Sequence, residues 1–330
     1  MPVGRAAKNE TLDSCKLLAC FFVVTIHVRF PGELGQLCVH LGRFAVPFFF
    51  MVSGYFTQAT DAGTLVATAK KRARKHLISF LACFLIYLAF HLIDIGRTDG
   101  IDDWVRDAVS PFNVFALVVL SWTTPYVGVG HLWFLLALTY VYVLYAIVSQ
   151  HSLLKAAERF SAVSIVLVVA VEAARYYLPG FDLMSIWYRN AFFLGFPCFM
   201  LGNHLGRSRC PEPSERRGQK PLTRSGLGML LVGLGLFLAE VGLRLDGFDL
   251  YPSSLALAYS SFLFALDHPG ARSSVLSMLG RGYSAKVYAW HYLLFMFLKR
   301  FVMMDISVGL MPLVVFFGTL LWQVTLTYAV

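Results

Sequence analysis

The chain is poor in charged residues. Only 14% of its 330 residues are Asp, Glu, Lys or Arg, whereas 58% are hydrophobic. Soluble domains carry about a quarter charged residues, so the composition leaves little room for a separate soluble domain. The apolar residues come in blocks that approach the roughly 20 residues needed to cross a bilayer. The sequence therefore predicts an all-α polytopic transmembrane helical bundle, and its net charge of +9 is no sign of nucleic-acid binding.

Several motifs are also absent. The six cysteines include no C-x-x-C pair, which argues against a zinc site and against a disulfide framework. The chain has no H-E-x-x-H motif and no carboxylate cluster, so no metal is expected. The first apolar block lacks an A-x-A-like cleavage site, which predicts that the first helix is retained. We find no symmetric pair of broken helices, the feature that usually marks a transporter.

Apolar blocks recur along the whole chain and predict about ten transmembrane helices in a single membrane domain, residues 1–330. The segment 112–122 is too short to span and is predicted to lie at the interface or dip into the bilayer. The predicted helices are 12–30, 41–57, 76–96, 131–149, 160–178, 190–206, 225–244, 252–266, 285–303 and 307–328.

The basic residues are distributed asymmetrically. With the N-terminus inside, the inner segments hold 19 of the 28 Lys and Arg residues, and the outer loop 97–110 carries four aspartates. The positive-inside rule then predicts a multi-pass protein of the cell membrane with both termini cytoplasmic. Segments 58–75 and 207–224 are expected to be cytoplasmic loops, and 97–128 extracytoplasmic. The basic run 70–75 is interpreted as an anchor facing anionic lipid, with an anionic ligand as the alternative.

Lys16 and His27 lie in an otherwise apolar stretch, where a charge and an imidazole are costly. They are eleven residues apart. At 3.6 residues per turn this is three turns plus about 20°, so both side chains share one helix face. Their axial separation is about 16 Å. We therefore expect a cation at the cytoplasmic mouth of the helix and a base far across the membrane.

That spacing suits a long ligand with an anionic head that enters from the cytoplasm. Coenzyme A carries phosphates at one end and a thioester at the tip of a flexible arm. A cation would bind the phosphate, and a neutral imidazole at the far end could deprotonate a hydroxyl. The structural alternative is a lysine that snorkels to the interface and a packed or interfacial histidine.

Several motifs of this sequence resemble those of the acyltransferase-3 family of integral membrane O-acyltransferases. Lys16, ten intervening residues and His27 resemble its basic-x10-His signature, and the preceding Asp13 resembles the start of that signature. Other segments match in the family's order. They are "GRFAVPFFFMVSGYF" at 42–56, "GHLWFLLAL" at 130–138, "RNAFFLGFPCFMLGNHLG" at 189–206 and "AKVYAWHYLLF" at 285–295.

The resemblance implies about ten helices and an acyl-CoA donor, usually acetyl-CoA. It also implies transfer to a hydroxyl, sometimes an amine, on an extracytoplasmic glycan, lipid-linked sugar or small molecule. The sequence departs from the family at Lys16, where many members have Arg, so a bidentate phosphate clamp becomes a point charge. The chain stops at "LTYAV", which suggests truncation of a longer protein. One family branch is fused to racemases in the membrane serine racemases of vancomycin resistance.

These observations lead to a set of candidate site residues. His27 is predicted to be the general base. Lys16, Tyr288 and His291 are predicted to bind the donor. Arg43, His131, Trp133 and Arg189 are predicted to contact the acceptor. Interfacial anchors and an aromatic belt are the alternative for the last four residues, and a satisfied core hydrogen bond is the alternative for Tyr288 and His291.

A solute transporter is the rival function from another class, either for uptake of serine or another amino acid or for glycan export. The lipid bilayer is an expected partner in both cases. The sequence does not specify the acceptor, the acyl chain length or the oligomeric state.

Overall fold

The computed structural model describes residues 9–58, 61–96, 100–178, 180–181, 183–209, 226–245, 248–270, 272–302 and 309–329. Throughout these ranges the regular structure is helical, with no strand. The all-α prediction is therefore confirmed. Most of the predicted loop 207–224 lies outside the described residues.

Residue contacts divide the chain into two units, Met1–Phe56 with His204–Val330, and Thr57–Asn203, with the boundary inside α10 (Phe196–Arg209). The prediction of one domain stays a prediction. The first unit contains α1 (Glu10–His27), α2 (Gly32–Gly42), α3 (Ala45–Tyr55), α11 (Gly226–Gly242), α12 (Pro252–Asp267), α13 (Val275–Phe297), η3 (Leu298–Val302) and α14 (Met311–Ala329). The second contains α4 (Ala62–Ile95), α5 (Ile101–Ala108), α6 (Pro111–Leu120), α7 (Thr124–Val127), α8 (Trp133–Gln150), α9 (Leu154–Tyr177), η1 (Ser185–Trp187) and η2 (Ala191–Gly195).

Each predicted span contains a helix, and the short segment 112–122 is the short helix α6. Within the described ranges, four helical segments are long and apolar enough to cross a membrane, which supports a membrane protein. Those candidate spans are Gly32–Tyr55, Ala62–Ile95, Trp133–Gln150 and Met311–Tyr328. The count of ten crossings and the cytoplasmic placement of the termini stay predictions.

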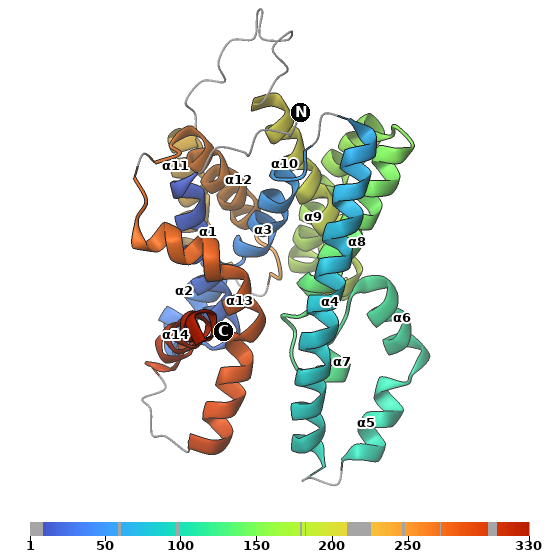
Figure 1. Cartoon of the computed structure of the whole chain (residues 1–330), viewed down its shortest axis with the longest axis vertical. Helices are drawn as coiled ribbons and strands as arrows, with labels where there is room; N and C mark the ends of the chain where they lie inside the picture. Colours follow the sequence, from blue (N-terminus) through green and yellow to red (C-terminus); the bar gives the residue numbers. More distant parts are fainter. Residues whose placement is uncertain are drawn as a thin grey trace, which may run out of the picture. The chain divides into compact units, whose positions relative to one another are not determined.

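Helix α4 begins earlier than predicted. Asp61 caps its N-terminus by accepting a hydrogen bond from the backbone N–H of Thr64 at 2.7 Å. From that cap the helix runs without a break through the basic run 70–75, so most of the predicted loop 58–75 is helical. Lys, Arg and Ala are good helix formers, which explains why a run without apolar periodicity continues the helix. In the second unit α4 packs along α8 (Figure 1).

The predicted helix 41–57 is interrupted near its start. Helix α2 ends at Gly42 and α3 begins at Ala45, so Arg43 lies at the break. Pro47 has no N–H to donate to the carbonyl of Arg43, which favours an interruption at this point. The apolar segment also extends back to Gly32.

Helices α1 and α13 pack in parallel, in the same chain direction. Three contacts show this. Arg281 meets Asp13, the thiol of Cys20 donates to the carbonyl of Ser284 at 3.2 Å, and the rings of His27 and His291 lie 5.6 Å apart. The two helices therefore run side by side with their N-terminal ends at the same end of the pair.

The two helices approach most closely at Gly280. A Cβ atom on Gly280 would lie 1.9 Å from the backbone oxygen of Asp13, in the middle of α1 backbone atoms that cannot rotate away. Helix α13 also starts at Val275, ten residues before the predicted span, behind a capping box between Ser274 and Ser277. The close approach therefore lies in a part of α13 that the sequence did not assign to a helix.

We expect Gly280→Ala to destabilise the protein by about 1–3 kcal/mol or more, because the added methyl forces α1 and α13 apart. Thermal unfolding of the purified protein would measure this change. Gly282→Ala is the matched control, because a Cβ at that glycine of the same helix meets nothing within 4 Å. Equal unfolding temperatures for the two variants would contradict the packing of α1 on α13.

Candidate functional site

His27 is the last residue of α1 and lies among aromatic side chains of α13. Its ring centroid is 5.6 Å from that of His291 and 6.2 Å from that of Tyr292. His291 lies level with His27, at the end of α1 opposite to Lys16. The structure thus pairs two histidines that are far apart in the sequence.

His291 is fully buried, and its backbone contacts define its neutral tautomer. Nδ1 lies 2.9 Å from the carbonyl oxygen of Tyr288 and 3.2 Å from that of Val287. A carbonyl oxygen only accepts, so Nδ1 carries the proton and Nε2 carries the lone pair of the neutral ring. A core hydrogen bond of His291, the alternative considered from the sequence, is therefore present.

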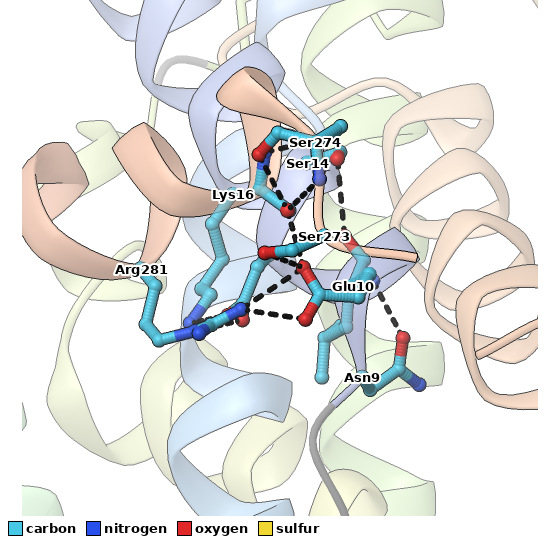
Figure 2. A network of polar contacts seen from close by, with 10 residues as sticks. Asn9, Glu10, Ser14, Lys16, Ser273, Ser274 and Arg281 are labelled. Atoms are coloured by element: carbon cyan, nitrogen blue, oxygen red, sulfur yellow. Dashed lines mark hydrogen bonds and ion pairs between the residues drawn. The ribbon is translucent and has the colours of Figure 1, made fainter. Parts of the chain in front are cut away.

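The opposite end of α1 carries a network of charges (Figure 2). The ammonium of Lys16 lies 2.5 Å from Oδ1 of Asp13, and Nε of Arg281 donates to Oδ2 of the same carboxylate at 2.6 Å. Nη2 of Arg281 also donates to both carboxylate oxygens of Glu10, each at 3.0 Å. Lys16 is thus held within an ion network, and one turn of α13 supplies its second cation.

Serine hydroxyls support this network from the start of α13. Ser273 donates to Oε2 of Glu10 at 3.1 Å, and the buried hydroxyl of Ser277 donates to the same oxygen. Asn9 begins α1 by accepting from the N–H of Leu12 at 2.8 Å. Glu10 is therefore fixed both by its helix and by its neighbours. The sequence analysis missed the network, although Glu10, Asp13 and Lys16 follow one another at i, i+3 spacing, the distance at which helix side chains meet.

Arg43 lies at the break between α2 and α3, where Nη2 is 3.7 Å from Oδ1 of Asp249. One turn earlier, Nε2 of the buried His40 lies 2.8 Å from Oε2 of Glu240. Glu240 also accepts from the N–H of Ser253 at 2.9 Å and from its hydroxyl. Both basic side chains of this turn thus face carboxylates. The sequence analysis identified Arg43 but not the His40–Glu240 pair, whose partners are 200 residues apart.

In the second unit the structure brings Trp133 and Arg189 together. The guanidinium carbon of Arg189 lies 5.8 Å from the ring centroid of Trp133. Asn190 shapes the turn that carries Arg189, because its side chain accepts from the N–H groups of Phe192 and Phe193 and donates to the carbonyl of Trp187. Trp133 and Arg189 line one small pocket. The remaining lining residues are Leu120, Ser121, Trp122 and Ile186.

His131 precedes α8 and is almost completely buried, at 1% exposure. Its ring lies 5.1 Å from the ring of Tyr87 in an edge-on arrangement. His131 is therefore a packed side chain of the second unit and does not line the pocket of Trp133 and Arg189. Its contact with an acceptor stays a prediction.

Metal ligands do not gather anywhere in the described part of the chain, where no group of three or more His, Cys, Asp or Glu side chains is placed to hold an ion. In the first unit, an imidazole pair lies at one end of α1, and a frame of two cations and two carboxylates lies at the other. Such a helix can bind an anion at one end and move a proton at the other.

Comparisons with known proteins bear on this arrangement. The family model described as an acyltransferase domain, acyltransferase-3, matches residues 9–330. The chain is 30% identical over 134 residues to a serine/alanine racemase of Enterococcus gallinarum. That match covers 38% of this chain and 19% of the length of the racemase. No solved structure matches the chain.

Proposed function

Because the chain belongs to the acyltransferase-3 family, as its motifs indicated, we propose that it transfers an acyl group from cytoplasmic acyl-CoA to an extracytoplasmic hydroxyl. Acetyl-CoA is the proposed donor, and a glycan, lipid-linked sugar or small molecule is the proposed acceptor. The observation that carries the proposal is the arrangement along α1, with Lys16 in an ion network at one end and His27 beside His291 at the other.

His27 is the proposed general base. The thioester of the donor supplies the acyl group, and the imidazole takes the proton of the attacking hydroxyl. His291 lies beside it in a fixed tautomer, with its Nδ1 proton committed to the backbone of α13. A ring held in this way restricts the orientation of its neighbour, and preorganisation of this kind is how enzymes keep a base in a reactive geometry.

Lys16, Tyr288 and His291 are proposed to contact the donor. The ammonium of Lys16 has three donors, of which Asp13 takes one, so the others can reach a phosphate. Tyr288 lies one helical turn before His291, with its ring 6.4 Å from that of Phe49. We assign to Arg43 a contact with the acceptor or with the developing oxyanion, where a guanidinium stabilises negative charge.

The acceptor is proposed to contact Trp133 and Arg189, whose pocket combines an aromatic face with a cation. Sugars and other polar acceptors bind to surfaces of this kind through stacking and hydrogen bonds. His131 is a further proposed acceptor residue.

Because the racemase match covers only 19% of that relative, racemisation is not part of the proposed function.

Transfer from labelled acetyl-CoA by membranes that contain the protein tests the proposed function. We expect label to appear in an extracytoplasmic product, or as released acetate when no acceptor is added. Membranes that contain the His27→Ala variant serve as the control, because they hold the same helices without the proposed base. Uptake of labelled serine by intact cells, with no transfer or hydrolysis of acetyl-CoA, would contradict the proposal and favour transport.

A further inference from the structure

We propose that Arg281 is a second phosphate-binding cation of the donor site, held next to Lys16 by the carboxylates of Asp13 and Glu10. This inference rests on the proposed function, because it names a further residue for the same acyl-CoA donor. Its basis is the geometry of the charge network where α1 and α13 start (Figure 2).

One edge of the Arg281 guanidinium is occupied and another is not. Nε donates to Asp13, and Nη2 donates to both oxygens of Glu10. Within the described residues, Nη1 makes no hydrogen bond or ion pair. An arginine whose Nε and Nη2 groups are committed retains the two N–H groups of Nη1. These donors are the ones that an incoming phosphate would meet.

The exposures of the four side chains point the same way. The side chain of Arg281 is 38% exposed and that of Lys16 is 16% exposed, whereas those of Glu10 and Asp13 are 8% and 9% exposed. The carboxylates therefore lie beneath the cations, which form the accessible side of the network. An anion that approaches from solvent reaches the guanidinium and the ammonium first.

The charges of the network explain why the carboxylates help and do not simply compete. Two carboxylates balance two cations, so the network as a whole carries no net charge. Asp13 bridges the cations by giving one oxygen to Lys16 and the other to Arg281. Glu10 is itself held by the hydroxyls of Ser273 and Ser277. A guanidinium restrained on one edge loses little further freedom on binding, which favours phosphate at its remaining donors.

A charge-balanced pair of substitutions tests the inference. Glu10→Gln with Arg281→Gln removes one negative and one positive charge, so the remaining Asp13–Lys16 pair is still compensated. We expect this double variant to bind coenzyme A about 10- to 150-fold more weakly than the wild type in calorimetric titration of the purified protein. Glu10→Gln alone keeps the guanidinium and an amide oxygen that can still accept from its Nη2, so we expect its coenzyme A affinity to stay close to that of the wild type.

Two further variants complete the test. Lys286→Gln is the matched control, because Lys286 is another cation of α13 whose ammonium instead contacts the hydroxyl of Thr327 at 2.9 Å; its coenzyme A affinity should not change. Arg281→Lys keeps the charge but cannot contact both carboxylates and a phosphate together, so its affinity should fall even if the double variant does not fold.

The outcomes separate the inference from the proposed function. Coenzyme A affinity equal to wild type in the double variant and in Arg281→Lys would show that Arg281 only joins two helices, and would overturn the inference. An equal loss of coenzyme A affinity in Glu10→Gln alone would show that binding depends on the carboxylate and not on the guanidinium of Arg281. That result would also overturn the inference. If the wild type itself binds no coenzyme A, both the proposed function and the inference about Arg281 fail.

Discussion

Replacing His27 with alanine is expected to lower acyl transfer by about a hundredfold or more and to leave donor binding intact. A positioned general base contributes about 10²–10⁴-fold in rate, and the acceptor hydroxyl would have to lose its proton to water in the variant. The expected signature is a lower kcat with an unchanged coenzyme A affinity, because His27 lies at the end of α1 opposite to the ion network.

The experiment requires a control for folding. His268→Ala is suitable, because that histidine of the same unit is exposed and its recorded contacts are with the carbonyl and the ring of Phe264, at the end of its own helix. His27→Ala should insert and unfold like the His268 variant. Acyl transfer at a near wild-type rate by His27→Ala would show that the imidazole is a packed side chain and that another group takes the proton.

Replacing Lys16 with alanine is expected to weaken donor binding by about 1.5–3 kcal/mol, the value of a charge-assisted hydrogen bond, or about 10- to 150-fold in Kd. Lys16→Arg should retain most of the affinity, because a guanidinium at this position still pairs with Asp13 and still offers donors to phosphate. Titration of the purified protein with coenzyme A would measure both variants. The variants at Lys16 leave Arg281 in place, so Asp13 keeps one cationic partner.

Lys286→Ala is again the matched control for removal of a cation, since Lys286 lies on α13 outside the network. Coenzyme A affinity equal to wild type in Lys16→Ala would contradict donor binding by Lys16 and favour the structural alternative, a lysine that snorkels to the interface. The Lys16 and His27 variants together form a stronger test than either alone. Lys16→Ala should weaken donor affinity without a matching loss in kcat at saturating donor. His27→Ala should lower kcat without a change in donor affinity.

Local sequence patterns were sufficient to predict where the longer apolar helices form and which of their residues share a face. Apolar blocks are a local property, and each predicted block contains a helix. The helical period of the sequence predicts that Lys16 and His27 share one helix, and α1 runs from Glu10 to His27. The local signal was less informative about helix ends. Caps and basic turns extend α4 and α13 beyond their apolar segments, and Pro47 interrupts the segment that carries Arg43.

The partners of these residues, in contrast, depend on how the helices pack in three dimensions. Asp13 and Arg281 are 268 residues apart in the chain, and no local pattern brings their charges together. Their contact depends on Gly280, which lets the backbones of α13 and α1 approach, and on parallel packing, which then brings His291 level with His27. The helical period determines which residues of α1 share a face. Close packing and the pairing of opposite charges determine which residues of α13 that face contacts.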